Sequence, residues 1–213
     1  VSNNVRVKDA SGLMAAEKNG DIAATRELDA LLADVEVIFG VEMPGNWLQR
    51  APGLRWFQIA SAGGDKQLSD AGMVESNVVV TNARGIYAII VSEFTFGLML
   101  TLAKRLNTCA RQQNDRLWKR YSPTPVAFPS KMVVIIGLDV IGREEARLAG
   151  AFGMRVLALD QQCHKKPRYV GQIFPPEGLK QLLEQSDFVL ISVPLTEQTC
   201  NLISREELRA MKP

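Results

Sequence analysis

The sequence is poor in the residues that cross-link small domains or hold metal ions. Its 213 residues include three cysteines and one histidine. The cysteines are odd in number, far apart and without C-x-x-C or Cys/His spacing, which argues against a disulfide framework and against a zinc site. We therefore expect no metal centre and a reducing, cytoplasmic location. The cysteines are Cys109, Cys163 and Cys200.

A strong charge imbalance and a long apolar run are also missing. The 25 basic and 23 acidic residues leave a net charge of +2. The densest basic stretch, residues 164–168, is only a short cluster, so we expect no nucleic-acid partner. The most apolar segment, residues 88–103, carries Glu93 and is shorter than the ~18 to 20 residues of a membrane span. Residues 1–6 lack the apolar core of a signal peptide. We expect no membrane partner, and we interpret residues 88–103 as a helix buried on nearly all sides.

Two α/β stretches flank this apolar helix. In each stretch, short apolar runs alternate with helical spacing, a rhythm that predicts a parallel sheet. The predicted strands cover residues 35–40, 54–59, 78–81, 132–136, 155–159 and 188–193, and the predicted helices cover residues 28–32, 47–48, 87–105, 141–152 and 179–184, with a polar helical stretch ending at residue 118. A last helix begins after Ser204, with Glu207 at the capping-box position. We expect an α/β fold of two lobes, residues 1–86 and residues 87–213.

The strongest motif is a glycine turn between a strand and a helix. An apolar strand ends at Gly137, and Gly142 follows where the next helix begins, which is the context of a dinucleotide-binding fingerprint. The first glycine would allow the tight turn, the second would allow close packing of helix on strand, and the helix N-terminus would face a pyrophosphate. Asp160 ends the next strand and is predicted to bind the adenine-ribose hydroxyl groups. Because two glutamines and no arginine follow it, the pattern favours NAD over NADP.

The middle glycine of the fingerprint is replaced by Asp139. That glycine normally lets the backbone approach the pyrophosphate, and here a negatively charged side chain takes its place. Two unit charges ~4 Å apart repel by about 4 kcal/mol at an effective dielectric constant near 20, an upper figure for a solvated turn. Each ~1.4 kcal/mol is a tenfold loss of affinity, so Asp139 predicts weak NAD binding. For this motif taken alone, the alternative is a βα turn that binds no nucleotide.

The residues around the motif form an ordered series. In the second half of the chain it comprises residues 137–144, 151–156, 186–188, 193–196, 199 and 202–203, and in the first half it comprises residues 51–56, 61–65, 81–85 and 92–93. From about residue 33 to residue 213, this series resembles the D-isomer-specific 2-hydroxyacid dehydrogenases. The resemblance implies a flavodoxin-like substrate lobe, clipped at its N-terminus, followed by part of a Rossmann nucleotide-binding lobe with a parallel sheet.

The resemblance also implies an activity: an NAD-dependent oxidoreductase that transfers a hydride between NAD(H) and a small 2-keto or D-2-hydroxy acid bound in the cleft between the lobes. The backbone N–H groups of Ala62, Gly63 and Gly64 would hold the substrate carboxylate. The long helix would help to form a homodimer. Beside Gly137, Gly142 and Asp160, the implied cofactor-binding residues are Asn82, Val140, Ile141, Val193, Pro194 and Thr199.

Catalysis in this family uses an arginine, a histidine and a glutamate. All three lie in segments that would follow Pro213, so the resemblance implies a truncated chain with no catalytic residue of its own. Arg84 belongs by its order to the substrate lobe and is not assigned the arginine's role, and we interpret His164 as a surface residue. The alternative hypothesis is a non-catalytic, degenerate relative that acts as a binding or dimerising scaffold. In either case we expect bare apolar faces, and hence pairing or aggregation of the isolated chain.

Overall fold

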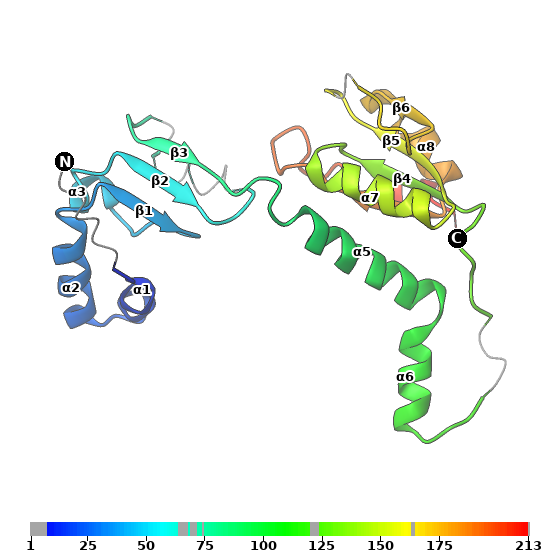
Figure 1. Ribbon diagram of the computed structural model, residues 1–213, viewed down its shortest axis with the longest axis horizontal. Coiled ribbons are helices and arrows are strands. Elements are labelled where there is room, and N and C mark those ends of the chain that lie inside the picture. Colours follow the sequence, from blue (N-terminus) through cyan, green and yellow to red (C-terminus); the bar gives the residue numbers. More distant parts are fainter. Residues whose placement is uncertain are drawn as a thin grey trace. The chain divides into compact units, whose positions relative to one another are not determined.

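The computed structural model describes residues 8–63, 68, 72–73, 75–119, 124–162 and 165–212. The chain divides into two compact units, Val1–Arg84 and Gly85–Pro213. Each unit has its own parallel sheet (Figure 1), so the predicted α/β fold is confirmed. Four residues named above, Gly64, Cys163, His164 and Pro213, lie outside the described residues. In the part of the chain that the structure describes, no helix is both long enough and apolar enough to cross a bilayer.

The first unit is a three-stranded sheet with order β1-β2-β3 and helices on one side (Figure 1). Asp21 begins one helix by accepting hydrogen bonds from the backbone N–H groups of Ala23 and Ala24 at 2.8 and 3.1 Å. Such a cap satisfies N–H groups that have no partner inside the helix. The elements are α1 (Ser11–Lys18), α2 (Ile22–Leu32), β1 (Val37–Gly40), α3 (Trp47–Arg50), β2 (Trp56–Ile59) and β3 (Val79–Thr81).

The two faces of this first sheet differ. Ile38, Phe57 and Val80 are register partners across the three strands and pack into the core with α1, α2 and α3. Successive residues of a strand point to opposite faces, so their neighbours form the other face. That face is exposed and apolar: Val37 is 50%, Phe39 72%, Trp56 43% and Val79 60% exposed.

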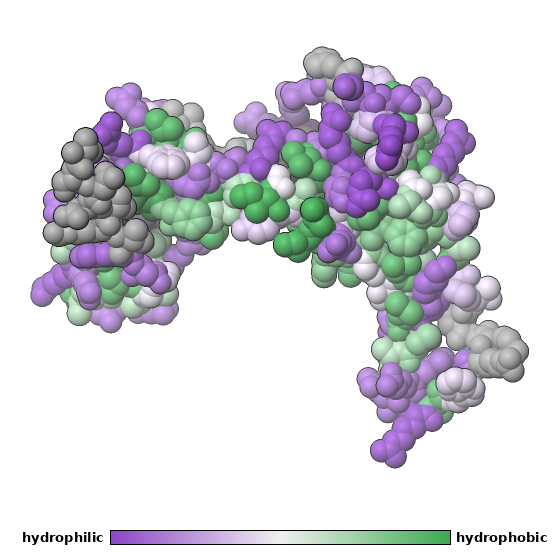
Figure 2. Space-filling view, in the orientation of Figure 1, coloured by the Kyte–Doolittle hydropathy of each residue, from purple (hydrophilic) through white to green (hydrophobic). Residues whose placement is uncertain are grey.

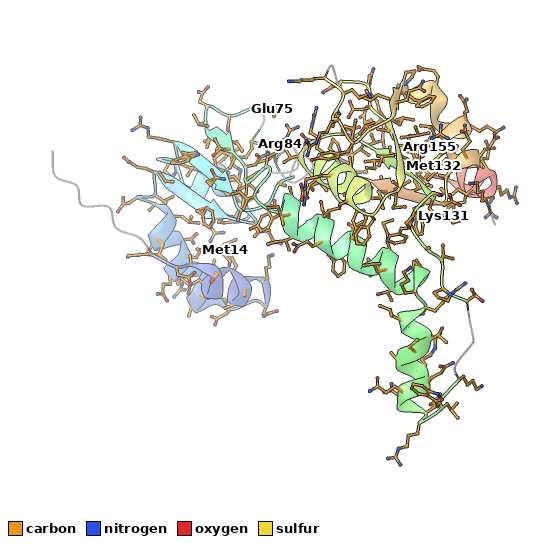
Figure 3. The ribbon with its side chains drawn as sticks, turned by 45° about the vertical axis from the view of Figure 1, so that its right-hand side comes forward. Met14, Glu75, Arg84, Lys131, Met132 and Arg155 are labelled. Carbon is orange, nitrogen blue, oxygen red and sulfur yellow. The ribbon has the colours of Figure 1, made fainter. Side chains whose placement is uncertain are left out.

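The second unit is built on a four-stranded parallel sheet with order β6-β5-β4-β7. Met132 and Arg155 are register partners at the start of β4 and β5, the end of the sheet where Figure 3 labels them. A capping box begins the last helix at Ser204, as predicted. The elements are α5 (Ala88–Ala103), α6 (Leu106–Asn114), β4 (Met132–Ile136), α7 (Val140–Ala151), β5 (Arg155–Leu159), β6 (Gln172–Phe174), a 3-10 turn (Pro176–Gly178), α8 (Leu179–Gln185), β7 (Phe188–Ile191) and α9 (Arg205–Ala210).

Strand β4 is covered on both faces. Val133 and Ile135 pack with α5 and α7 on one face, and Val134 and Ile136 pack with Leu182 of α8 on the other. All four of these β4 side chains are 0% exposed. A strand buried on both faces has an unbroken apolar sequence, which is why Met132–Ile136 has no polar residue.

Helix α5 corrects the expectation of burial on nearly all sides. Its buried residues form one stripe, Ala88, Ser92, Phe96, Met99 and Ala103, because the sheet and α7 contact only that side. The other side is exposed although it is apolar, and Figure 2 shows hydrophobic surface over the helix. A helix with apolar residues on all sides can therefore still be exposed on one side. The exposed apolar residues are Ile89, Ile90, Val91, Phe94, Leu98 and Leu102.

Candidate functional site

The glycine turn joins β4 to α7 at the carboxyl end of β4. Gly137 has a positive φ of +96°, and a Cβ added there would lie 2.7 Å from the Ser192 carbonyl oxygen. A Cβ added at Gly142 would lie 1.9 Å from the Gly137 carbonyl oxygen. Both contacts are closer than any side chain tolerates, and the positive φ also favours glycine. The turn therefore requires glycine at both positions, for the turn and packing roles that the motif predicts.

Asp160 stands beside this turn at the end of β5. One carboxylate oxygen accepts a hydrogen bond from the Leu138 N–H at 2.6 Å, and the other accepts from the Gln162 N–H at 2.7 Å. The Gly137 N–H donates to the Leu159 carbonyl at 2.8 Å. Asp160 thus ties the glycine turn to the end of the neighbouring strand, a structural role that the sequence did not indicate.

Asp139 is the N-cap residue of α7. Its φ of −73° and ψ of −167° are ordinary extended values, and its side chain makes no capping hydrogen bond. The backbone at this position therefore needs no glycine, and the consequence of Asp139 lies in its side chain and charge. That charge stands at the N-terminus of α7, and the N-terminus is the end of a helix that attracts anions.

The segment after β7 completes the same edge of the sheet. The Ser192 N–H donates to the Ile136 carbonyl at 2.8 Å, which continues the pairing with β4. Farther along, the Thr199 hydroxyl donates to the Pro194 carbonyl at 2.5 Å and accepts from the Thr196 N–H at 2.8 Å. These bonds fold residues 194–199 into a compact turn.

The predicted nucleotide residues of the second unit therefore gather at one edge. From β4 the chain moves outward to β5 and then β6, and it then returns to place β7 on the other side of β4. The strand order therefore reverses between β4 and β7. In open α/β sheets, ligands bind outside the carboxyl ends of the strands at this reversal. The residues that follow the carboxyl ends of β4, β5 and β7 are Gly137, Val140, Ile141, Gly142, Asp160, Val193, Pro194 and Thr199.

The predicted residues of the first unit gather at the carboxyl ends of β2 and β3. The Asn82 side-chain amide donates to the Ala62 carbonyl at 3.2 Å, and the Ala83 N–H donates to the Ser61 carbonyl at 3.0 Å. Asn82 also accepts a hydrogen bond from the N–H of Arg84, the residue labelled in Figure 3 at the end of this unit. The structure thus joins Asn82 to the loop of Ala62 and Gly63, and its implied role at the cofactor stays a prediction.

One residue at the nucleotide edge was missed by the sequence reasoning. Glu145 lies on α7 and is 3% exposed. Its carboxyl accepts a hydrogen bond from the Ser192 hydroxyl at 2.7 Å. Burial raises the pKa of Glu145, against the hydrogen bonds from Ser192 and Thr95 that lower it. The signal was present, because a glutamate stands on a helix face whose other buried members are Gly142, Ala146 and Ala149.

These features define a class of protein. A parallel strand buried on both faces enters a turn that requires two glycines, an acidic residue ends the neighbouring strand, and the chain reverses direction beside it. This arrangement is that of a dinucleotide-binding α/β domain.

Comparison with known proteins identifies the family. The model of the NAD-binding domain of D-isomer specific 2-hydroxyacid dehydrogenases matches residues 96–213. The chain therefore belongs to the D-isomer-specific 2-hydroxyacid dehydrogenase family, as the resemblance implied.

The names of similar proteins are consistent with this family. A glyoxylate reductase of Korarchaeum cryptofilum is 30% identical over 202 residues, which is 90% of this chain and 57% of the relative. A D-3-phosphoglycerate dehydrogenase of Methanocaldococcus jannaschii is 29% identical over 84% of this chain and 34% of the relative. The chain thus spans between a third and somewhat over half of these relatives.

A solved structure also resembles the chain. The D-lactate dehydrogenase of Aquifex aeolicus, determined in complex with NAD and lactic acid, is 26% identical, with a TM-score of 0.73 over 86% of this chain and 56% of that one. A family protein of Aeromonas salmonicida shares the fold with a TM-score of 0.80, covering 96% of this chain and 67% of that one at 24% identity.

Proposed function

We propose that the protein is an NAD-dependent oxidoreductase that transfers a hydride between NAD(H) and a small 2-keto or D-2-hydroxy acid. The observation that carries the proposal is the glycine turn, in which Gly137 and Gly142 leave no room for a side chain, beside Asp160 at the reversal of the sheet. The relatives named glyoxylate reductase and the D-lactate dehydrogenase solved with NAD and lactic acid support the same reaction class. In this proposal the first unit is the substrate lobe and the second unit holds the cofactor.

The cofactor would bind at the carboxyl edge of the second sheet. The N-terminal turn of α7, with Val140 and Ile141, would face the pyrophosphate, and Val193, Pro194 and Thr199 would line the adenosine side. Asp160 can still bind the ribose, because an ionised carboxylate has about four acceptor sites and two are used by backbone N–H groups.

The substrate carboxylate would bind to backbone N–H groups of Ala62, Gly63 and Gly64. Asn82 supports this assignment, because its amide holds the Ala62 carbonyl and so helps to fix the direction in which the neighbouring N–H groups point. We expect a small anionic acid as the substrate, since backbone N–H groups bind a carboxylate without selecting its side chain.

The first test concerns the cofactor. NADH fluorescence titration of the protein should show weak binding, because Asp139 brings a negative charge to the N-terminus of α7, which would face the pyrophosphate. We expect the substitution Asp139→Gly to tighten NADH binding by about tenfold or more, up to the limit set by a repulsion of about 4 kcal/mol. Asp139→Asn is the matched control that removes the charge and keeps the side chain, so equal gains in both variants would assign the effect to charge alone.

The second test concerns hydride transfer. The protein is purified at the length at which its source produces it. NADH oxidation is then followed by absorbance with glyoxylate, hydroxypyruvate and pyruvate as substrates. Turnover with one of these acids is the expected result. Absence of turnover with all three, together with NADH affinity that stays unmeasurable in Asp139→Gly, would overturn the proposal.

A second candidate is the non-catalytic scaffold, favoured by Asp139 and by the bare apolar side of α5. On that side Ile90 is 64%, Phe94 68% and Leu98 52% exposed, and large exposed apolar patches mark interaction surfaces. A homodimer through this side suits both candidates. Phe94→Glu should then shift the protein toward monomer in size-exclusion chromatography with light scattering. Failure of Asp139→Gly to restore NADH binding would favour the scaffold over the enzyme.

A further inference from the structure

Glu145 is a buried acid inside the nucleotide unit to which neither the glycine motif nor the family resemblance assigns a role. It lies on the inner face of α7, where its neighbours Ala146 and Ala149 are both 0% exposed. Burial of a carboxyl group is unfavourable unless the group is hydrogen-bonded. The partners of Glu145 therefore show what the residue holds together.

Those partners come from two other elements. The Ser192 hydroxyl, which follows β7, donates to Glu145 Oε2 at 2.7 Å. The Thr95 hydroxyl of α5 is the second hydrogen-bond partner of the carboxyl group. Thr95 also donates to the Val91 carbonyl at 3.0 Å, and a hydroxyl group has only one hydrogen to donate. The hydrogen bond from the Ser192 hydroxyl is therefore the one that the Glu145 carboxyl group does not share with another acceptor.

Ser192 is the residue that closes over the glycine turn. Its carbonyl oxygen lies where a Cβ of Gly137 would approach to 2.7 Å, and its N–H is bonded to Ile136 of β4 at 2.8 Å. Gly142 of α7 in turn contacts the carbonyl of Gly137. The contacts form a closed ring, from Glu145 to Ser192, to Gly137, to Gly142 and back along one turn of α7.

We propose that Glu145 is a positioning residue of the nucleotide site, which fixes the end of β7 against the glycine turn through its hydrogen bond to Ser192. The turn leaves no spare space at either glycine, so a shift of Ser192 moves the N–H groups at the start of α7 and the segment of Val193 and Pro194 together. The inference deepens the proposed function and rests on it only for the identity of the nucleotide.

Three variants separate the hydrogen bond from the bulk of the side chain. Glu145→Gln keeps a side-chain oxygen that can accept the hydrogen bond from Ser192 and removes the charge of the carboxylate. Glu145→Leu keeps a similar volume and loses both bonds. Ser192→Ala removes the other partner and leaves the interior of α7 unchanged, so it tests the same contact if Glu145→Leu does not fold.

The first readout needs no ligand. Amide hydrogen exchange, measured by NMR, should be about tenfold faster or more at residues 137–142 and 192–193 in Glu145→Leu and in Ser192→Ala, because a buried polar partner is lost. The exchange rates should stay near the wild-type values in Glu145→Gln, and β5 should be unchanged in all three variants. Unchanged exchange at the turn in both Glu145→Leu and Ser192→Ala would overturn the proposal, as would equal loss of protection in Glu145→Gln and Glu145→Leu.

The second readout is NADH affinity, measured by fluorescence titration in the Asp139→Gly background. We expect the dissociation constant to rise about tenfold in Glu145→Leu and to change less than about twofold in Glu145→Gln. Faster exchange at the turn without NADH binding in any variant would refute the proposed function and leave the positioning role intact. NADH binding that is equal in all variants, with unchanged exchange, would refute the positioning role and leave the proposed function intact.

Discussion

The two parallel sheets of the chain differ in how their faces are covered. In the second unit, α5 and α7 cover one face of β4 and α8 covers the other, so Val134 and Ile135 are 0% exposed. In the first unit, the described helices lie on one face only, and Phe39 and Val79 on the other face are 72% and 60% exposed. A comparable strand composition thus stands in a closed interior in one unit and on an open surface in the other.

This difference shows that an apolar strand sequence does not by itself show whether both faces of the strand are packed against other elements. Full burial of a valine or phenylalanine side chain stabilises by about 1.5–3 kcal/mol relative to exposure. The closed sheet already gains this free energy within its own unit. On the open face, this free energy is gained only when another surface covers the exposed side chains.

Glycine substitutions should give the largest contrast between closed and open surroundings. Gly142→Ala places a methyl group 1.9 Å from the Gly137 carbonyl oxygen, whereas a Cβ at Gly97 of α5 has nothing within 4 Å. We expect Gly142→Ala to cost about 3 kcal/mol or more of unfolding free energy. Gly97→Ala should gain about 0.5–1 kcal/mol, since alanine favours a helix interior. Urea unfolding checks both, and a loss in Gly97→Ala similar to that in Gly142→Ala would contradict the open surroundings of α5.

Valine substitutions compare the two sheets with identical chemistry. Val134 in β4 is 0% exposed and Val79 in β3 is 60% exposed. Val134→Ala should cost about 2–3 kcal/mol, from lost burial and the cavity left behind. Val79→Ala should cost less than about 1 kcal/mol, as surface changes usually do. Equal losses in urea unfolding would mean that the face of Val79 is covered in solution.

The sequence indicated the parts of the fold that depend on local pattern. The apolar run of β4, the glycine turn after it and the capping box of Ser204 and Glu207 are all present. Each of these depends on residues adjacent in the chain, so a single sequence carries the information.

The sequence did not indicate what depends on distant neighbours. The prediction that α5 is buried on nearly all sides was wrong, because composition does not show how many other elements pack against a helix. Strand β6 was missed because Gln172–Phe174 has only two consecutive apolar residues, whereas the equally short β3 lies in a run of three valines, residues 78–80. At the candidate site, the gathering of Asp160 and Gly137 followed from the motif, whereas the contact of Glu145 with Ser192 joins residues 47 positions apart and needed the structure.

Self-association tests whether the open sheet face binds another surface. We expect the isolated chain to pair or aggregate, and Phe39→Ser to weaken this association by about tenfold, since part of a phenylalanine's burial is lost. Ile22 is 70% exposed but lies on α2, so Ile22→Ser is the control and should change association little. A monodisperse wild-type monomer in size-exclusion chromatography with light scattering would contradict this prediction.

Two carboxyl groups, one partly exposed and one buried, allow the same comparison at single residues. Asp187 stands at the partly open amino edge of the second sheet, where it accepts a hydrogen bond from the Met132 N–H at 2.9 Å and pairs with Lys131 and Lys212. Although burial acts to raise it, the pKa of Asp187 is lowered by these partners. Glu145 in the closed interior has the opposite shift, because burial raises its pKa.

The signs of the two effects on stability are therefore opposite. The favourable contribution of Asp187 is present at neutral pH and is lost as the pH falls through its lowered pKa. That of Glu145 is present in acid and is lost as the pH rises through its raised pKa. Asp187→Asn should thus cost about 1.5–3 kcal/mol near neutral pH, the range for hydrogen bonds to charged groups, and should approach wild type in acid. Glu145→Gln should match wild type in acid and exceed its stability at higher pH, because glutamine never ionises. Urea unfolding between about pH 3 and pH 8 measures both, and stability differences that change with pH in the same direction would show that Glu145 is not closed off from solvent.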